Sequence, residues 1–336
     1  MNYRNLGNSG LQVSEICFGV MSFTGSAGWR HIAETDQKEA NGMIDIALDS
    51  GINFFDTADI YSDGESEKML GTALKNRRHD AVIATKCGFR THPGPNGDGL
   101  SRRHIFEACE ASLKRLQTDY IDLYQIHSFD FNTPLDETLR AFNDLIRAGK
   151  VRYIGCSNFF AWQLMKALAI QEKNGWQRFI SLQAYYSLVG RDLEWELAPL
   201  CEDQGLGILP WSPLHGGFLS GKYRRNSDWP LNTRIKSIKE TLPFDGEKGL
   251  DIVEILWQIS NSRNATVAQV ALNWLLCKPM VTAIVIGARN EDQLRENIAT
   301  TDWQLDDEEV KQLDEISQPQ KPYPSWYFEI FRGEQL

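Results

Sequence analysis

The chain has 336 residues, with 45 acidic and 35 basic side chains and a formal net charge of −10. So acidic a balance argues against a general binder of nucleic acid or of anionic membranes. The hydrophobic fraction of 42% is ordinary for a globular protein, and no apolar stretch approaches the length of a membrane span. The first residues carry no apolar signal segment, and we expect a cytoplasmic protein.

Short apolar runs alternate with amphipathic segments along the chain. Two short runs within 3–15, separated by glycines, indicate a hairpin, and 16–19 is the first predicted buried strand. Seven more strands are predicted at 52–55, 82–86, 121–126, 151–156, 179–184, 206–211 and 281–286. Helices are predicted at 39–50, 65–75, 102–116, from Thr133 to Gly149, and at 159–173, 193–203, 247–262, 266–277, 290–299 and 306–316.

Two helix starts carry specific signals. Thr133 is predicted to be an N-cap, with Pro134 in the first helical position. Thr266 and Gln269 have the spacing of a capping box.

Eight strands, each followed by a helix, predict an α/β fold with a parallel sheet closed into a (β/α)8 TIM barrel. A barrel of this kind accounts for 1–336 as a single domain, with no evident linker. The N-terminal β-hairpin is expected to close the bottom of the barrel, and extra helices follow at the C-terminus. The six cysteines lie far apart in apolar surroundings, so we expect buried free thiols and no metal site.

Several of the predicted strands lead into residues that can take part in chemistry. Asp56 and Tyr61 follow the strand at 52–55, Lys86 ends the strand at 82–86, and His127 follows the strand at 121–126. In a barrel of parallel strands, catalytic groups come from the ends of several different strands. We therefore expect these four side chains to converge although the chain separates them widely.

Such a set suits proton transfer to or from an oxygen atom. An unperturbed phenol has a pKa near ~10, and an adjacent ammonium lowers it, so Lys86 is expected to tune Tyr61. Asp56 can hold Lys86 charged, and His127 can donate a hydrogen bond to a substrate oxygen. Tyr61 would then protonate an alkoxide as it forms. This chemistry fits carbonyl reduction, which needs a source of hydride.

Other interpretations remain open at this point. Each of the four residues alone has a structural explanation, such as a turn cap, a solvated charge or simple packing. A lyase or isomerase that forms a Schiff base on Lys86 is disfavoured, because Asp56 would keep that amine protonated. The run from Gly216 to Lys222 matches most of a P-loop, but Tyr223 stands where a hydroxyl ligand for Mg²⁺ is needed.

These residues carry a resemblance to a known family. The string Asp56-Thr57-Ala58-x-x-Tyr61, followed by Lys86 and by His127 after a Leu-Tyr-Gln-Ile run, resembles the aldo-keto reductase family. Further matches follow in order at 155–159 (GCSNF), 182–186 (LQAYY), 211–214 (WSPL) and 287–289 (GAR). Members of that family are (β/α)8 barrels that bind NADPH without a Rossmann domain. The resemblance therefore implies an NADPH-dependent oxidoreductase that reversibly reduces the carbonyl of an aldehyde or ketone.

The resemblance also implies roles. Tyr61 would be the general acid, tuned by Asp56 and Lys86, and His127 would orient the carbonyl. NADPH/NADP contacts would come from Asp56 and from three groups of residues. These are Ser157, Asn158 and Gln183 at the nicotinamide carboxamide; Trp211, Ser212, Pro213, Leu214, Gly217, Leu219 and Lys222 around the pyrophosphate; and Gly287, Arg289, Gln293, Glu296 and Asn297 at the adenosine, with Arg289 on the 2′-phosphate.

The chain departs from the family pattern after the first strand. Val20 and Met21 stand where many relatives have Trp or Thr, at a place expected to contact nicotinamide and substrate. Trp29 in the loop that follows is a candidate substrate contact, together with Tyr61 and His127. The alternative function is a regulatory subunit that keeps barrel and cofactor, as the potassium-channel β subunits of this family do.

Overall fold

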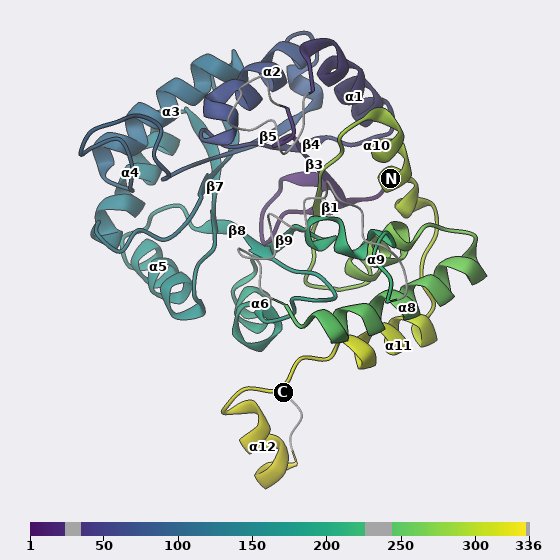
Figure 1. The fold of residues 1–336 in the computed structure, drawn as a ribbon. Helices are drawn as coiled ribbons and strands as arrows, with labels where there is room; N and C mark the ends of the chain where they lie inside the picture. Colours follow the sequence, from purple (N-terminus) through teal and green to yellow (C-terminus); the bar gives the residue numbers. More distant parts are fainter. Residues whose placement is uncertain (24–34, 226–243, 334–336) are drawn as a thin grey trace.

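The computed structural model describes residues 1–23, 35–225 and 244–333. Eight parallel strands form the inner wall, in the order β10-β3-β4-β5-β6-β7-β8-β9, and helices surround them (Figure 1). The strands are β3 (Ile16–Gly19), β4 (Phe54–Asp56), β5 (Val82–Cys87), β6 (Ile121–Ile126), β7 (Val151–Ser157), β8 (Phe179–Tyr185), β9 (Gly207–Trp211) and β10 (Ile284–Ile286). The predicted (β/α)8 barrel is confirmed.

The helices of the outer ring follow the predicted order. They are α1 (Gln37–Asp49), α2 (Glu65–Ala73), α3 (Arg102–Leu116), α4 (Leu135–Arg147), α5 (Ala161–Lys173), α6 (Leu193–Gln204), α8 (Gly246–Arg263), α9 (Val267–Leu276), α10 (Glu291–Ile298) and α11 (Asp307–Ser317). Short 3₁₀ segments are η2 (Tyr61–Gly64), η3 (Arg78–Asp80), η4 (His215–Ser220) and η5 (Ala299–Asp302).

The last gap in the sheet is closed by backbone contacts just before β10. Ile208 and Val281 form a parallel bridge. The Thr282 amide donates to the Ile208 carbonyl at 2.9 Å, and the Ile208 amide donates to the Met280 carbonyl at 3.3 Å. The wall is therefore continuous, and the carboxyl ends of all its strands face the same way.

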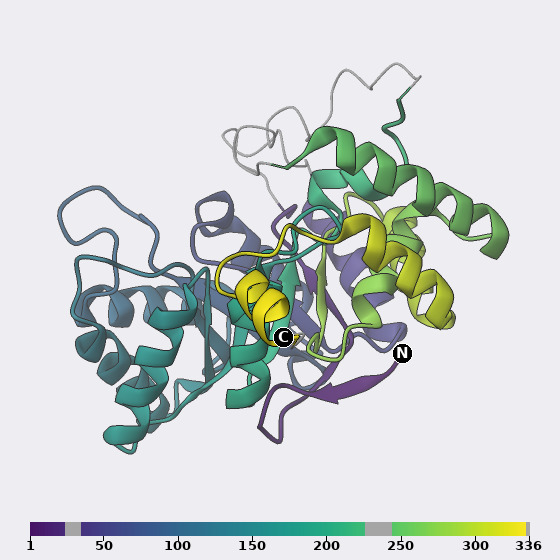
Figure 2. The same cartoon turned by 90° about the horizontal axis from the view of Figure 1, so that it is seen from below.

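The hairpin of β1 (Tyr3–Asn5) and β2 (Gln12–Ser14) closes one end of the barrel, as predicted (Figure 2). Its Leu6 and Val13 belong to the inner apolar cluster, together with Cys17, Phe54, Ala84, Leu123, Ile180, Leu209, Ala283 and Val285. A β-carbon at Gly7, whose φ is +56°, would stand 2.2 Å from the Ile180 carbonyl oxygen. Only glycine lets the hairpin approach this closely. A larger apolar cluster lies between strands and helices.

The two predicted helix starts have different outcomes. The capping box at α9 is confirmed, since Thr266 accepts from the Gln269 amide and Gln269 bonds the Thr266 amide. The cap at α4 is wrong: Pro134 is the N-cap residue, with no side-chain cap. The Thr133 hydroxyl donates instead to Asp130 at 2.6 Å. Donation to this carboxylate orients the hydroxyl towards Asp130, and its oxygen accepts from no amide at the start of α4.

The extra C-terminal elements end in α12 (Ser325–Arg332), which buries none of its residues and is drawn apart from the barrel in Figure 1. Its exposed large side chains are Trp326, Tyr327, Ile330 and Phe331. Within the described ranges no helix is both long and apolar enough to cross a membrane. Cys17, Cys87, Cys109, Cys156 and Cys201 are buried free thiols, and Cys277 is half-buried and free.

Packing of α2 against α3 depends on Gly71. A β-carbon there would stand 2.5 Å from the carbonyl carbon and oxygen of Leu116. Because these are backbone atoms, one helix would have to move. We predict that Gly71→Ala lowers the free energy of unfolding by about 1–3 kcal/mol, as overpacking usually does. Urea denaturation of the wild type and the variant measures this change in unfolding free energy.

The matched control is Gly246→Ala at the start of α8, where an added β-carbon meets nothing within 4 Å. This variant should keep or slightly raise the stability, because Ala favours a helix over Gly by about 1 kcal/mol. Equal stability changes in the two variants would contradict the proposed contact.

Candidate active site

Lys86 stands at the centre of the carboxyl end of the barrel, with a fully buried side chain. Its ammonium donates to Asp56 Oδ1 at 2.5 Å, to the Thr57 carbonyl at 2.8 Å and to the Tyr61 hydroxyl at 3.4 Å. An ammonium has three hydrogens to donate, and these contacts account for all three. Burial alone would lower the pKa of Lys86, but its interactions with Asp56 and Tyr61 raise it above the ordinary value. The amine is therefore charged.

Asp56 is held on its other oxygen by two amides. Asp56 Oδ2 accepts from Gln183 at 2.8 Å and from Gln125 at 3.2 Å. Gln125 is fully buried on β6, and sequence reasoning missed it because a glutamine within an apolar strand carries no catalytic signal. The two amides and Lys86 fix the carboxylate in one orientation.

Tyr61 and His127 face one another across the opening. Their ring centroids lie 5.7 Å apart with the rings almost perpendicular, and Phe89 packs against His127 at 4.6 Å. Burial, and then the charge on Lys86, lowers the pKa of His127 well below its usual value. His127 Nδ1 has no hydrogen-bond partner among the described residues. A neutral imidazole can donate one hydrogen bond to a ligand.

The tetrad predicted from the strand ends is thus brought together. Asp56 and Lys86 lie on β4 and β5, Tyr61 begins η2, and His127 follows β6. This site can hold a charged ammonium beside a phenol and orient an oxygen atom with an imidazole.

Ser157 ends β7 and Asn158 follows it, beside the tetrad. Asn158 Nδ2 donates to the His127 carbonyl at 2.9 Å, and Asn158 Oδ1 accepts from Trp211 Nε1 at 3.2 Å. Asn158 has a positive φ of 57°, which is uncommon outside glycine and often marks functional sites. Ser157 is almost completely buried.

The segment after β9 is also unusual in its backbone. Ser212 and His215 have positive φ angles of 54° and 46°, and Gly217 has a φ of 92°. A β-carbon at Gly217 would meet nothing within 4 Å, so space beside this backbone is open. Among the other predicted residues of the segment, Pro213 and Leu219 are buried, Leu214 is half-buried and Lys222 is exposed.

The start of α10 presents an exposed cation. Asn290 is the N-cap residue, accepting from the Gln293 amide at 2.9 Å, and Gln293 Oε1 accepts from the Arg289 amide at 3.0 Å. The Arg289 side chain is exposed and has no ion pair among the described residues. Gly287 and Glu296 are exposed, and Asn297 bonds the Gly287 carbonyl at 3.3 Å.

Three residues after the first barrel strand are predicted to contact nicotinamide or substrate. Val20 is fully buried, while Met21 is half-exposed. Trp29 lies outside the described residues.

Tyr185 forms a polar pair with His215, a residue that sequence reasoning missed. The Tyr185 hydroxyl lies 2.5 Å from His215 Nδ1, and the Tyr185 and Trp211 rings lie 5.2 Å apart. Burial lowers the pKa of His215 to about 4, so its ring is neutral and can accept from the phenol. The pair joins β8 to the segment after β9. His215 lies in a glycine-rich run with no strand pattern, which is why no sequence signal marked it.

A second buried carboxylate lies behind the tetrad. Asp59 is 3% exposed, and neither of its carboxylate oxygens has a hydrogen-bond partner among the described residues. Burial, and then the nearby Glu67, raises the pKa of Asp59 to about 8, against the opposing effects of Arg115 and Lys86. Glu67 itself accepts from Thr85 and Arg115, each at 2.6 Å. Asp59 is therefore mostly protonated at neutral pH.

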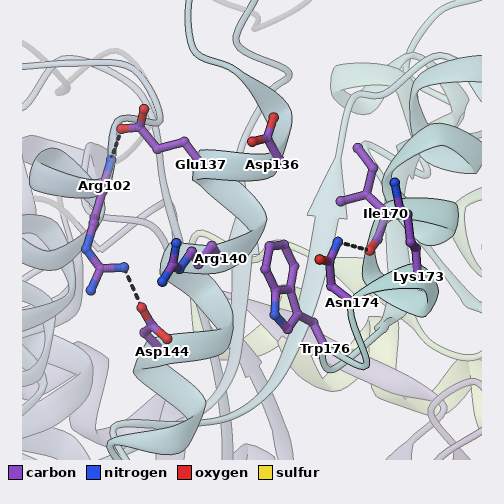
Figure 3. Close-up of a pocket in the computed structure, with 9 residues that line it drawn as sticks. All are labelled: Arg102, Asp136, Glu137, Arg140, Asp144, Ile170, Lys173, Asn174 and Trp176. Atoms are coloured by element: carbon purple, nitrogen blue, oxygen red, sulfur yellow. Dashed lines mark hydrogen bonds and ion pairs between the residues drawn. The ribbon is translucent and has the colours of Figure 1, made fainter.

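One described cavity lies near the carboxyl end of the barrel, and another lies on its flank. The first, of about 460 Å³, is lined by residues 158–161 after β7, by the end of β8 and by the start of α6, among them Asn158, Tyr185 and Trp195. The other, of about 840 Å³, lies between α4 and α5 and is lined mainly by charged side chains (Figure 3). No tetrad residue lines either cavity. Asn158, which bonds the His127 carbonyl, connects the smaller one to the candidate site.

Comparison with known proteins agrees with this geometry. The model of the Aldo/keto reductase family matches residues 15–318. The chain is 37% identical to versiconal hemiacetal acetate reductase of Aspergillus parasiticus over 96% of this chain and 99% of that protein. It is 40% identical to the uncharacterized oxidoreductase YrpG of Bacillus subtilis, over 94% and 96%. It is also 37% identical to a probable voltage-gated potassium channel subunit beta of Arabidopsis thaliana, over 90% and 92%.

The raised pKa of Asp59 gives a prediction about stability. In the folded chain Asp59 keeps its proton up to about pH 8, whereas an unfolded aspartate loses it near its ordinary value of 3.8. Between these values the folded state binds more protons, so stability falls as pH rises. Asp59→Asn should remove this loss. As pH rises through that window, the unfolding free energy of the variant minus that of the wild type should increase by up to about 1.4 kcal/mol per pH unit.

Urea denaturation of both proteins at several pH values between 5 and 8 measures the difference. The change of this stability difference with pH is the informative quantity, because the amide of the variant also alters packing by an amount that does not depend on pH. Parallel pH profiles would contradict a protonated Asp59.

Proposed function

The chain belongs to the aldo/keto reductase family, and from that premise we propose that it is an NADPH-dependent oxidoreductase. It reduces the carbonyl of an aldehyde or ketone to an alcohol, reversibly, with Tyr61 as the general acid. The observation that carries this proposal is the charged Lys86, bonded to Asp56 at 2.5 Å and to the Tyr61 hydroxyl at 3.4 Å, beside a neutral His127.

The residues of this chain fit the cofactor. Added β-carbons at Gly217 and Gly287 would meet nothing within 4 Å, so a ligand can approach the backbone there. Asn158 and Gln183 offer amide groups for a carboxamide, next to the tetrad. Arg289 precedes the N-terminus of α10, where a guanidinium and the helix end together attract a phosphate. When bound, the cofactor would supply the hydride.

The side chains of the tetrad would then transfer the proton to the substrate oxygen. Tyr61 donates its hydroxyl proton to the substrate oxygen as negative charge grows there. The ammonium of Lys86 stabilises the phenolate that remains, and Asp56 holds Lys86 in place. His127 donates a hydrogen bond that orients the same oxygen. In the reverse direction the phenolate accepts the proton of the alcohol.

The surroundings favour an apolar carbonyl compound of some size. Phe89 lies against His127, and Phe129 packs against Phe159 at 5.2 Å on the neighbouring loops. Among the relatives, one is named a versiconal hemiacetal acetate reductase and another a putative aryl-alcohol dehydrogenase of Schizosaccharomyces pombe. Aromatic aldehydes are therefore the first substrates to assay.

A regulatory role is the second candidate, favoured by the similarity to probable potassium channel β subunits of Arabidopsis thaliana and Oryza sativa. The intact tetrad favours catalysis. Mixing the protein with NADPH and a panel of carbonyl compounds, and with NADP⁺ and the matching alcohols, decides between them. Turnover supports the enzyme; cofactor binding without turnover of any compound supports the regulatory role.

We predict that Tyr61→Phe lowers the turnover number about 10²- to 10⁴-fold, because the variant loses its proton donor. Binding of NADPH should remain near normal. Steady-state assays and cofactor titration by fluorescence measure the two quantities. Tyr120→Phe is the matched control, since Tyr120 precedes β6 at the opposite end of the barrel. Near-normal turnover in Tyr61→Phe would show that another group supplies the proton.

Arg289→Ala should weaken NADPH binding roughly 10- to 150-fold, the value of one charge-assisted hydrogen bond. NADH, which lacks the 2′-phosphate, should lose far less affinity. Arg295→Ala, near the other end of α10, is the control and should leave both affinities unchanged. An equal loss for the two cofactors, or none, would mean that Arg289 does not read the phosphate.

A further inference from the structure

Three side chains of metal-ligating type meet between the β5–α3 loop and α3. A nitrogen of His92, a nitrogen of His104 and a carboxylate oxygen of Glu107 all lie within 4.8 Å of one another. His92 belongs to the loop, and His104 and Glu107 to the first turns of α3. Residues three apart on a helix share one face, so α3 presents two of the three groups together. His104 follows His92 by twelve positions, and sequence spacing predicted no metal site.

His104 is the buried member of this cluster. It is 1% exposed, and neither ring nitrogen has a hydrogen-bond partner among the described residues. A buried imidazole with no partner is unfavourable, and coordination would satisfy it.

The loop holds His92 over His104 through its own contacts. Arg90 donates to the Gly94 carbonyl at 2.8 Å and pairs with Asp98 at 2.5 Å. The His92 and His104 ring centroids lie 6.2 Å apart. His92 Nδ1 lies 3.1 Å from the Pro93 carbonyl oxygen, so a proton on Nδ1 leaves the Nε2 lone pair free. Metal-ligating histidines characteristically donate their second nitrogen to such an oxygen.

Glu107 is an exposed member of the cluster and is held by one surface ion pair. Its Oε1 accepts from Arg103 Nε at 3.0 Å, in a pair whose side chains are 67% and 47% exposed. An ion pair this exposed contributes little, so the carboxylate is free to turn towards a cation.

We propose that His92, His104 and Glu107 bind a divalent transition-metal ion, of which Zn²⁺ is the best-fitting class. Two imidazoles and one carboxylate are a common zinc donor set, with water in the fourth position. Ligand atoms about 2.1 Å from a tetrahedral zinc stand about 3.4 Å from one another. Since the three ligand atoms lie within 4.8 Å of one another, the widest pair must contract by at most about 1.4 Å. Magnesium and calcium prefer oxygen ligands and do not fit two imidazoles.

Such an ion would clamp the β5–α3 loop to α3. The same loop carries Phe89, which packs on His127 of the tetrad at 4.6 Å. Metal binding would thereby fix one wall of the candidate active site. The binding itself is independent of the proposed reductase function, and only its effect on turnover rests on that function.

The test is calorimetric titration of the full chain with Zn²⁺ after treatment with a chelator. One site is expected, and His92→Ala and Glu107→Gln should each weaken it at least about tenfold, since loss of even a supporting contact costs 10- to 100-fold. Both residues are exposed, so the variants should fold normally. His79→Ala and Glu308→Gln, exposed elsewhere, are the controls and should bind as the wild type does.

Two further readouts separate this site from others. Co²⁺ should give the visible spectrum of a four-coordinate ion in the wild type and in the controls, but not in His92→Ala. Zn²⁺ should raise the melting temperature of the wild type and not that of His92→Ala, because an ion that binds only the folded state stabilises it. Absence of binding, or equal affinity in all variants, would overturn the proposal. Neither result bears on whether the chain turns over carbonyl compounds.

Discussion

The ion pair of Lys86 and Asp56 is the interaction on which the carboxyl end of this barrel depends. Both side chains are almost wholly buried, at 0% and 4% exposure. Charges removed from water are costly unless every donor and acceptor finds a partner. Here the ammonium has three acceptors, and the carboxylate receives Gln125 and Gln183 as well as Lys86. The strands β4, β5, β6 and β8 are thus joined through one carboxylate.

A second layer of ionisable groups lies behind this pair and connects it to the helices. Glu67 on α2 is fully buried and receives Thr85 from β5 and Arg115 from α3. Asp59, whose amide donates to the Lys86 carbonyl at 3.1 Å, lies close to Glu67 and stays mostly protonated because of burial and that neighbouring charge. Two carboxyl groups in a buried space rarely ionise together. The protonated one keeps the charge behind Lys86 small.

Specific function in such a barrel depends on the loops at the carboxyl ends of the strands. Relatives of similar identity to this chain include a named reductase and probable channel subunits. The β5–α3 loop of this chain carries Phe89 against His127 and brings His92 to α3. This loop therefore joins the proposed ion site to the surroundings of His127.

The sequence by itself determined the barrel and the convergence of the tetrad, because strand ends of a parallel barrel meet at one rim and periodicity marks those strands. It also determined the capping box at Thr266, which is a local interaction. Only tertiary structure decided the Gln183–Asp56 contact across 127 residues, the burial of Asp59 and the meeting of His92 with His104. It likewise decided that the Thr133 hydroxyl bonds Asp130 and does not cap α4. These outcomes depend on which distant side chains share a buried space, which spacing along a chain does not encode.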